Sequence, residues 1–389
     1  MEVISKLFSL VPDDLLENLA ISTGVNKFSK KLQGELLFKL LLYCIVTEKE
    51  NSLRSMQSAL ESSVFRALST NNPDGKISHS SISERLTGMK SSFFEEIFQA
   101  CVRTYKKSLG KYEGAVIRFD STIVSLSAKL LQTGYRLKGG DAEKYRLLKF
   151  TIGFTNIPEV VYFYTDQRHN SENVALAESI LGYGLKTEKI NVFDRGITAR
   201  DNYDKLTENN VRFISRINND PKLTEHKANV LTKTITTPTL NIISDRWVYL
   251  YTMHARRSLH PVRIIKALKK ANGEPITFLT NITDLKPKEI TEIYKSRWGI
   301  EVFFKFIKQH LNFSHLLNRS ENGIRIILYV TMTAAMLLLH YKKEKMLKGF
   351  KIVKQKFAQH LERDIIYNLV IICEGNPKKA KKILYPDSS

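Results

Sequence analysis

The stretch AVIRFDSTIVSL, residues Ala115–Leu126, marks the point where the character of the chain changes. Its β-branched and aromatic residues predict a buried strand, whereas residues 1–108 carry apolar side chains at helical spacing. Two more strands are predicted in LLKFTIGFTN and EVVYFYTDQ. The chain then alternates between helix and strand through SENVALAESILGYG, KINVFDRG, TARDNYDKLTEN and VRFISRI. This β-β-β-α-β-α-β order predicts an α/β fold in which helices pack on a mixed sheet.

The sequence divides into five regions. Residues 226–257 are rich in Thr, Ile and Val, with turn residues between the runs, which is typical of a β-rich insertion. We therefore expect a helical N-terminal region, an α/β core, the insertion, a second part of the core and a helical, basic C-terminal region, over residues 1–108, 109–217, 218–285, 286–345 and 346–389.

One short helix of the N-terminal region is a candidate for contact with DNA. ISHSSISERL predicts a polar helix with Ser81 as its N-cap and Glu84 completing a capping box. The helix carries Arg85 and could be the reading helix of a helix-turn-helix unit. A plain surface helix is the alternative.

The charge of the chain indicates a polyanionic partner. Among 389 residues, 60 Lys and Arg stand against 39 Asp and Glu, which gives a net charge of +21 and a pI near 9.7. Nucleic acid is the commonest partner of so basic a protein, although the charge could serve solubility alone. Hydrophobic residues make up 43%, enough for a sizeable core, so global disorder is excluded.

The cysteines and the apolar segments predict a cytoplasmic protein without a membrane span. Cys44, Cys101 and Cys373 are far apart and form no CxxC pair, so we expect buried thiols in a reducing compartment. The N-terminus lacks the basic segment and cleavage site of a signal peptide. The longest apolar stretch, Ile326–Leu339, is shorter than the roughly 20 residues of a membrane helix. It predicts a buried helix instead.

Two aspartates lie in predicted buried strands. Asp120 belongs to AVIRFDSTIV and Asp194 to NVFDRG, and apolar residues precede each of them. A buried, ionised carboxylate is costly unless a cation, a metal or hydrogen bonds compensate it. Either aspartate alone could simply cap a turn at a strand end. Two of them in one sheet of a basic chain indicate a divalent-metal site, because Mg²⁺ prefers carboxylates together with phosphate oxygens.

A third acid lies on a long helix that is predicted to begin near Pro287, with Thr283 or Asp284 as its cap. At about 100° per residue, one side of this helix is apolar. The opposite side gathers two aromatic residues, three cations and one carboxylate: Tyr294, Arg297, Trp298, Glu301, Lys305 and Lys308. An exposed Arg297–Glu301 salt bridge is one interpretation. Aromatic residues beside cations are also typical of a surface that binds nucleic acid.

At these residues the chain resembles a known family. The Y-R-E-K signature of the insertion-sequence-four family of bacterial DDE transposases is matched by Tyr294, Arg297, Glu301 and Lys308. Asp120 in FDSTIV and Asp194 in VFDRG are similar to the first two catalytic acids of that family, and Glu301 to the third. The resemblance covers roughly residues 110–340 and implies a ribonuclease-H-like catalytic core with a β-rich insertion.

The resemblance also implies an activity and its partners. A transposase of this family would cut and paste double-stranded DNA, with the three acids holding two Mg²⁺ ions, for which Mn²⁺ is expected to substitute. Water would free a 3′-OH at the end of the element, and this 3′-OH would attack the opposite strand or target DNA. A homodimer in a synaptic complex with the terminal inverted repeats is expected.

Several further residues are expected to contact DNA. By the same resemblance, phosphates near the cut would be bound by Tyr294, Arg297 and Lys308. Lys305 shares their predicted face. Trp298 would either stack on a displaced base or pack against the sheet. The basic loop AKLLQTGYRLKGGDAEKYR, which includes Arg136 and Lys138, is a candidate track for the DNA backbone, or a solvated loop.

Three other functions fit parts of the pattern. A metal-dependent nuclease would cut DNA without strand transfer. A DNA-binding inhibitor of transposition would keep the fold without catalysis, although the presence of all three acids and all four signature residues argues against this. A tyrosine recombinase would use Tyr294 as its nucleophile.

Overall fold

The structure is a computed structural model that describes residues 11–27, 29–48, 51–68, 76–108, 114–127, 135–136, 145–218, 221–229, 234–252, 255–311, 313, 318 and 320–385. The chain forms two compact units. The helical unit comprises Met1–Ser108, Leu126–Thr133 and Lys305–Ser389, and the sheet unit comprises Leu109–Ser125 and Gly134–Phe304. Each unit is described by itself below.

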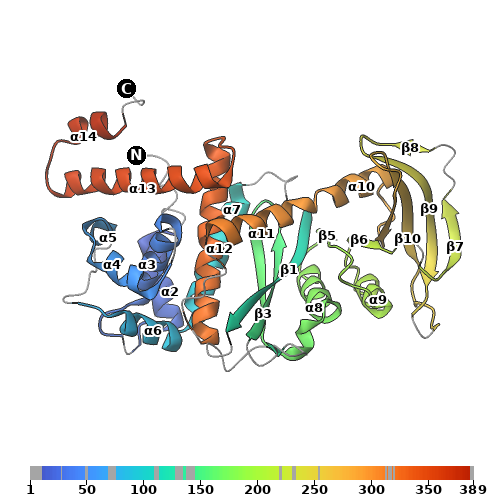
Figure 1. Cartoon of the computed structure of the whole chain (residues 1–389), viewed down its shortest axis with the longest axis horizontal. Helices are drawn as coiled ribbons and strands as arrows, with labels where there is room; N and C mark the ends of the chain where they lie inside the picture. The colour runs from blue at the N-terminus through green and yellow to red at the C-terminus, as the bar shows by residue number, and fades with distance from the viewer. Residues whose placement is uncertain are drawn as a thin grey trace. The chain divides into compact units, whose positions relative to one another are not determined.

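One mixed sheet forms the basis of the sheet unit (Figure 1). Its eleven strands, all within the described residues, are β1 (Val116–Ser127), β2 (Tyr135–Arg136), β3 (Tyr145–Phe154), β4 (Pro158–Tyr164), β5 (Ile190–Val192), β6 (Phe213–Ile217), β7 (Leu223–Asn229), β8 (Ile235–Thr236), β9 (Leu240–Leu250), β10 (Val262–Lys269) and β11 (Pro275–Thr280). The predicted α/β fold with a mixed sheet is confirmed, and so are the strands and helices expected between residues 115 and 217. The two-residue strand β2 was not predicted.

The order of the strands shows how the β-rich segment joins the core. It runs β2-β3-β1-β5-β6-β11-β10-β9-β7, with β4 beside β3 and β8 beside β9. β1, β5 and β6 are parallel, whereas β11 pairs antiparallel with β6, and β10 and β9 follow antiparallel. The strands of 218–285 therefore extend the same sheet, because β11 takes the free edge of β6.

Helices cover both faces of this sheet. On one face, α8 (Glu172–Gly184) and α9 (Arg200–Glu208) bury apolar side chains against Ile117 and Phe119 of β1. On the other face, α10 (Pro287–Lys295) buries Ile290 and Tyr294 against Val192 and Ile214. Alternate residues of each strand serve the two cores, as the period of two in a strand requires.

The single long helix predicted from Pro287 is wrong, because the helix is interrupted after Lys295. α11 begins at Trp298 and ends at His310. In the turn between the helices, the main-chain N–H groups of Ser296 and Arg297 donate to carbonyls three residues back, in the manner of a 3₁₀ turn. Proline is the first residue of α10 as predicted, but Lys286 is the N-cap.

This interruption changes which side chains share a face. The apolar side of α11 is buried as predicted, at Ile300, Phe303, Phe304, Ile307 and Leu311. Tyr294 was predicted on the cationic face. It is only 8% exposed, and its ring packs edge-on to Phe278 with centroids 5.2 Å apart. The turn breaks the helical phase on which that prediction depended, so the predicted six-residue face does not form as one surface.

The helical unit gathers nine helices within the described residues, in addition to the second half of α11: α2 (Asp13–Thr23), α3 (Gly34–Thr47), α4 (Leu53–Glu61), α5 (Ser63–Leu68), α6 (His79–Gly88), α7 (Ser91–Ser108), α12 (Glu321–Glu344), α13 (Phe350–Ile372) and α14 (Pro377–Leu384). α12 packs against α3, α6 and α7. By length and composition alone it could cross a membrane, but most of its apolar length is buried here. The predicted buried helix over Ile326–Leu339 is thus confirmed.

Three predictions for residues of this unit need correction. The N-cap of α6 is Ser78, whose side chain accepts a hydrogen bond from the N–H of Ser81, so Ser81 is inside the helix. Arg85 donates from Nε to the carbonyl of Leu32 (2.8 Å) and from Nη2 to that of Val25 (2.7 Å), which ties α6 to the segment before α3. Cys373 is exposed, whereas the other two cysteines are buried as predicted.

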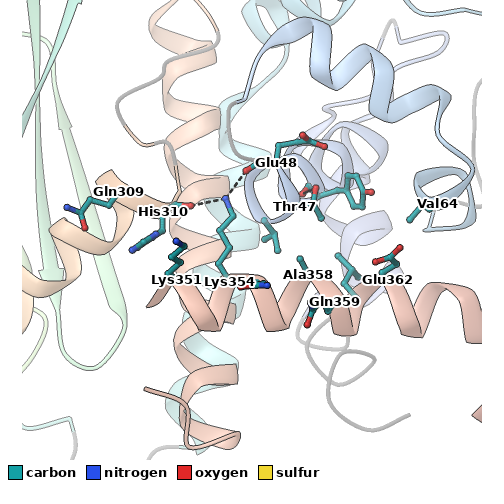
Figure 2. Close-up of a pocket in the computed structure, with 14 residues that line it drawn as sticks. Thr47, Glu48, Val64, Gln309, His310, Lys351, Lys354, Ala358, Gln359 and Glu362 are labelled. Carbon is teal, nitrogen blue, oxygen red and sulfur yellow. Dashed lines mark hydrogen bonds between the residues drawn. The ribbon is translucent and has the colours of Figure 1, made fainter. Parts of the chain in front are cut away.

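A cavity of about 790 Å³ opens within the helical unit beside α3 and α13 (Figure 2). At its wall, the half-buried ammonium of Lys354 donates to the carbonyl of Glu48 (2.8 Å) and to that of His310 (2.9 Å). These carbonyls end α3 and α11, where helix dipoles favour a cation. Burial nevertheless lowers the pKa of Lys354 to about 8. Lys354 thus joins the ends of two helices to α13.

We predict that Lys354→Met lowers the free energy of unfolding by about 1–2 kcal/mol, because two half-buried carbonyls lose their donor. Lys351→Met, on the exposed side of the same helix, should change it by less than about 0.5 kcal/mol. Urea denaturation followed by circular dichroism measures both. Equal stability of the two variants would contradict the role of Lys354.

Candidate active site

Charged residues stand in register across three neighbouring parallel strands. Arg118 of β1 lies opposite Val192 of β5, which lies opposite Ile214 of β6. Two residues further along the three segments come Asp120, Asp194 and Arg216. The carboxyl ends of parallel strands are where α/β sheets bind ligands. The register therefore gathers these three side chains at the edge where a site is expected.

Asp194 has already left its strand, which ends at Val192. It stays beside β6 because Ser215 Oγ donates to its carbonyl oxygen (2.9 Å). Its Oδ1 accepts a hydrogen bond from the N–H of Gly196 (2.9 Å). Asp194 therefore caps the turn after its strand, which is the structural role that the sequence left open. Among the described residues, no hydrogen bond to its second oxygen, Oδ2, is found.

The turn between α10 and α11 is fixed to the strand that carries Asp120. Arg118 donates from Nε to Ser296 Oγ (3.1 Å) and from Nη1 to the carbonyl of Thr155. Because Arg118 and Asp120 are two residues apart, they point to the same face of the sheet. The contact therefore holds the start of α11 on the face where Asp120 lies.

Arg297 and Glu301 form the i,i+4 ion pair that the sequence suggested. The pair is not a simple surface salt bridge, because the Arg297 side chain is only 15% exposed. Its charge also acts on Asp120 and on Asp194. Arg297 thus pairs with Glu301 and acts through its charge on the two aspartates. The predicted salt bridge is present, and the catalytic role of the three acids stays a prediction.

Arg216 belongs to this place but was missed by sequence reasoning. It lies on β6 opposite Phe278 of β11, and its charge acts on the hydroxyl of Tyr294. The Nε groups of Arg216 and Arg297 are both buried, and the described part of the chain offers neither a hydrogen-bond partner. The signal in the sequence that could have found Arg216 is a basic residue inside the predicted strand VRFISRI.

Glu172, the first residue of α8, is a fourth acid that sequence reasoning missed. A Cβ placed on Gly196 would come within 2.1 Å of Glu172 Oε2 and 3.2 Å of Asp194 Oδ1. The two carboxylates therefore face each other across this glycine. An acid in the first turn of a helix is common, since it complements the helix dipole, so the sequence offered no specific signal.

The carboxylates of this site affect one another's pKa values. Burial and the neighbouring Asp194 raise the pKa of Asp120 to about 7, and Glu172 adds to the rise, against the Ser121 N–H and Arg297. Burial and Asp194 also raise the pKa of Glu172, against the buried ammonium of Lys149. Burial and mutual repulsion thus both favour the protonated forms of Asp120 and Glu172.

The chemistry of these carboxylates, although not their spacing in this structure, suits a hard divalent cation. Carboxylate oxygens are the ligands that Mg²⁺ prefers, and a bound cation would oppose the burial and the repulsion by Asp194 that raise the pKa of Asp120. Within the described residues, no three His, Cys, Asp or Glu side chains lie close enough together to hold an ion as they stand. Glu301 is held by Arg297, so binding would have to draw the carboxylates together.

The other predicted DNA contacts are placed as follows. Trp298 is 64% exposed at the start of α11, so it does not pack against the sheet. Lys305 and Lys308 are exposed on the second half of α11, which belongs to the helical unit. Arg136 lies in β2, but its side chain is outside the described part of the structure, and so is the whole of Lys138.

A buried ion pair positions the entry into α10. Arg263 of β10 binds Asp245 of β9 through two hydrogen bonds (2.8 and 2.7 Å), and both side chains are almost fully buried. Arg263 Nη1 also donates to the carbonyls of Ile282 (3.2 Å) and Leu285 (2.7 Å). Asp284, a predicted cap, pairs with Arg212 instead (2.6 Å). The extended sheet thus anchors the segment that leads to Arg297 and Glu301.

Comparison with known proteins identifies the class to which this fold and site belong. The family described as "Transposase DDE domain" matches residues 113–337, which is more than half of the chain and contains all the acids discussed above. The chain belongs to this family of DDE transposases.

Individual relatives agree with this assignment. "Putative transposase for insertion sequence element IS4SA" of Synechocystis sp. is 28% identical over 255 residues, which cover 62% of this chain and 66% of the relative. "Probable transposase for insertion sequence element IS5377" of Geobacillus stearothermophilus is 28% identical over 152 residues, 39% of each chain. "Putative transposase y4zB" of Sinorhizobium fredii is 36% identical over 97 residues, 25% of this chain and 27% of the relative. The chain thus spans between about a quarter and two thirds of the length of these relatives.

We predict that Arg263→Met lowers the free energy of unfolding by about 3–5 kcal/mol, because Asp245 is left as an unpaired buried charge. The matched control is Arg256→Met, which breaks an exposed pair with Asp201 and should cost less than about 1 kcal/mol. Chemical denaturation distinguishes the two. A similar loss for both variants would show that the buried pair has no special role.

A second prediction concerns pH. The folded pKa of Asp120 is raised to about 7, above its ordinary value near 3.9. The folded state therefore favours the protonated acid, and this group destabilises the metal-free protein as pH rises through that interval. In EDTA at pH 8, Asp120→Asn should raise the melting temperature by a few degrees, and the gain should shrink at pH 5. Differential scanning fluorimetry measures both values.

The matched control for this prediction is Asp14→Asn, which changes an exposed aspartate and should leave the melting temperature unchanged at both pH values. A lower melting temperature for Asp120→Asn than for the wild type at pH 8 would show that the pKa of Asp120 is not raised by its burial and its neighbours.

Proposed function

We propose that the chain is a cut-and-paste DNA transposase of the insertion-sequence-four family, with Asp120, Asp194 and Glu301 as its catalytic acids. One observation carries the proposal: the strand register places Asp120 beside Asp194, and Arg297 connects both with Glu301. Membership of the DDE family and the relatives named for insertion sequences support it. The Y-R-E-K spacing supports the narrower family.

We further propose that the core has the ribonuclease-H-like fold. Its support is the order β1, β3 and β4, then α8, β5, α9 and β6, with β5 and β6 added in parallel beside β1. The strands from β7 to β11 would be the insertion between the second and third acids, and the N-terminal helices would recognise the inverted repeats.

The three acids would hold two Mg²⁺ or Mn²⁺ ions, which would activate the attacking oxygen and stabilise the leaving oxygen of the cleaved phosphate. For this, Glu301 must exchange its partner Arg297 for a cation. The exchange would leave the Arg297 guanidinium without its carboxylate, beside the two aspartates. Arg297 is then available to a phosphate of the DNA.

The cationic side chains at this place are suited to bind that phosphate. The unpaired Nε groups of Arg216 and Arg297 are N–H donors in a buried setting, where a phosphate oxygen would satisfy them. The hydroxyl of Tyr294, close to both guanidiniums, would be a third donor. Together they would fix the scissile phosphate against the acids, and positioning contributes much of the rate of phosphoryl transfer.

Beyond the acids, the contacts with DNA would be made mainly by the basic side chains of this positively charged chain. Double-stranded DNA, as inverted repeats and as target, is the proposed partner, and a net charge of +21 supports it. Lys305, Lys308, Arg136 and Lys138 would contact the backbone. Trp298 is exposed and would stack on a displaced base. Arg85 is engaged with two main-chain carbonyls, so we assign it no DNA contact. A homodimer in a synaptic complex completes the proposal.

The alternative functions are separated by specific observations. A tyrosine recombinase needs an accessible nucleophile, whereas Tyr294 is 8% exposed and burial raises its pKa, so this function is disfavoured. A nuclease without strand transfer and an inactive inhibitor share the same fold. They differ from a transposase in the products that they form.

The test is Mg²⁺-dependent cleavage and joining of DNA that carries the ends of the element. Glu301→Gln and Asp120→Asn should each lower cleavage at least about a hundredfold, as expected when one preorganised electrostatic group is lost. Glu292→Gln, an exposed glutamate of α10, is the matched control and should cleave as the wild type does.

The same reactions contain a supercoiled target plasmid, so that joined products report strand transfer. Cleavage without joined products would favour the nuclease. No cleavage by the wild type in Mg²⁺ or Mn²⁺ would favour the inhibitor. Full cleavage by either acid variant would overturn the assignment of the acids.

A further inference from the structure

The two faces of the outer part of the sheet differ in how their cations are paired. β7 is the last strand of the sheet, with β9 beside it (Figure 1). On the face that carries α8 and α9, Val248 of β9 is buried in the core. The cation on that face, Arg246, pairs with Glu225 of β7 (3.6 Å). Because side chains alternate along a strand, Trp247 and Tyr249 lie on the opposite face.

Basic and aromatic side chains gather on that opposite face. Lys227 of β7 lies across from Trp247. The ring of His226 packs edge-on against the Tyr249 ring, with centroids 5.2 Å apart, and the guanidinium carbon of Arg257 lies 4.4 Å from the centre of the same ring. The three basic residues are exposed, whereas the two aromatic residues are half-buried. We refer to these five residues as the open face.

The cations of the open face have no acidic partner among the described residues. The acids nearby are already paired with other cations. Arg256, the neighbour of Arg257, pairs with Asp201. Asp245 lies on the same face of β9, but it is 4% exposed and accepts two hydrogen bonds from Arg263. Uncompensated positive charge beside aromatic rings is typical of a surface that binds nucleic acid.

Arg257 is held in a way that leaves its guanidinium available to a ligand. Its main chain pairs with that of Tyr251, and the N–H of the next residue, Ser258, donates to the carbonyl of Leu250 (2.7 Å). A cation is attracted to the face of an aromatic ring, so the contact with Tyr249 needs no N–H···O hydrogen bond. The guanidinium is thus oriented before a ligand arrives, and its planar set of N–H donors matches a phosphate group.

The open face lies at a distance from the candidate active site that a DNA duplex can span. Arg216 of β6 is in line with Asp245 of β9, because the intervening strands place Phe278 and Ile265 between them. Tyr249 lies four residues beyond Asp245. With about 4.8 Å between strands and about 3.3 Å per residue, roughly 20 Å separate Tyr249 from Arg216. This is the length of about six base pairs of duplex DNA.

We propose that the open face is a second DNA-binding surface of this protein, where Arg257 and Lys227 bind backbone phosphates of a duplex away from the cleaved bond. The inference deepens the proposed function and rests on double-stranded DNA as the partner. Tyr249 is a positioning residue in this surface, since it holds the guanidinium of Arg257. The contact requires no metal ion, so it can be measured without catalysis.

Binding of a labelled duplex of about 30 base pairs, roughly three turns of DNA, tests the inference by fluorescence anisotropy in EDTA. Arg257→Gln in the full-length protein should weaken the affinity about 5- to 20-fold, because one charged contact with a phosphate is lost. Arg256→Gln is the matched control. It removes the same charge one residue away, from a cation already paired with Asp201, and should stay within about twofold of the wild type. Equal affinities of the two variants would overturn the inference.

Salt dependence separates a phosphate contact from a general effect of charge. Each phosphate contact contributes about 0.9 to the slope of log affinity against log salt concentration. Arg257→Gln should therefore make this slope less negative by about one, whereas Arg256→Gln should leave it unchanged. If the slope for Arg257→Gln equals that of the wild type, Arg257 binds no phosphate and the proposal is wrong.

The ring beneath Arg257 provides a test that a merely structural role would not satisfy. Tyr249→Leu should weaken duplex binding about two- to fivefold, since the guanidinium loses the ring that orients it. Tyr249→Phe keeps the ring and should bind as the wild type does. In an Arg257→Gln background, Tyr249→Leu should have little further effect, because the two residues act through one contact. Equal effects of Tyr249→Leu in both backgrounds would refute the positioning role.

Lys227 provides an independent measurement on the other strand of the open face. Lys227→Gln should weaken duplex binding about threefold, uniformly across DNA sequences, as expected for a phosphate contact. Its control is Lys269→Gln, which removes a cation already paired with Glu274 (2.7 Å) and should have no effect. Unchanged affinity of Lys227→Gln would refute a surface that includes both strands. Thermal melts confirm that each variant is folded.

The outcomes also separate this inference from the proposed function. If Glu301→Gln abolishes cleavage while Arg257→Gln and Lys227→Gln bind the duplex as the wild type does, the transposase stands and the open face is rejected. If the folded wild type binds no duplex, both proposals fail.

Discussion

The register between β1, β5 and β6 is the constraint on which the site depends. Because Arg118, Val192 and Ile214 are aligned, the residues two positions further on meet at one edge of the sheet. Two of them are aspartates, and burial together with their repulsion raises the pKa of Asp120. A shift of one residue in this register would turn Asp120 to the other face of the sheet and remove the site.

Cations from three different elements balance this concentration of negative charge. Arg297 comes from the turn before α11, Arg216 from β6 and Lys149 from β3. None of them forms a close ion pair with Asp120 or Asp194 among the described residues. The cation and the phosphate that we propose would supply the charges and acceptors that the metal-free protein lacks.

The continuity of the sheet explains how the third acid reaches this edge. β11 follows β6 and leads directly into α10, and the buried Arg263–Asp245 pair fixes that connection. The turn after α10 is then held by Arg118, from the strand of Asp120 itself. Strands β9 to β11 thus help to position Glu301, because they belong to the same sheet as the aspartates.

The sequence by itself determined the strands and helices of the core, the placement of Asp120 in a strand, the apolar side of α11 and the excess of positive charge. These follow from local patterns of residue type and spacing. Only the tertiary structure decided the break after Lys295, the burial of Tyr294, the hydrogen bonds of Arg85 and the arrival of Arg216 and Glu172 beside the aspartates. Each of these features depends on residues that are distant in the chain. The spacing of residues along one segment could therefore not predict them.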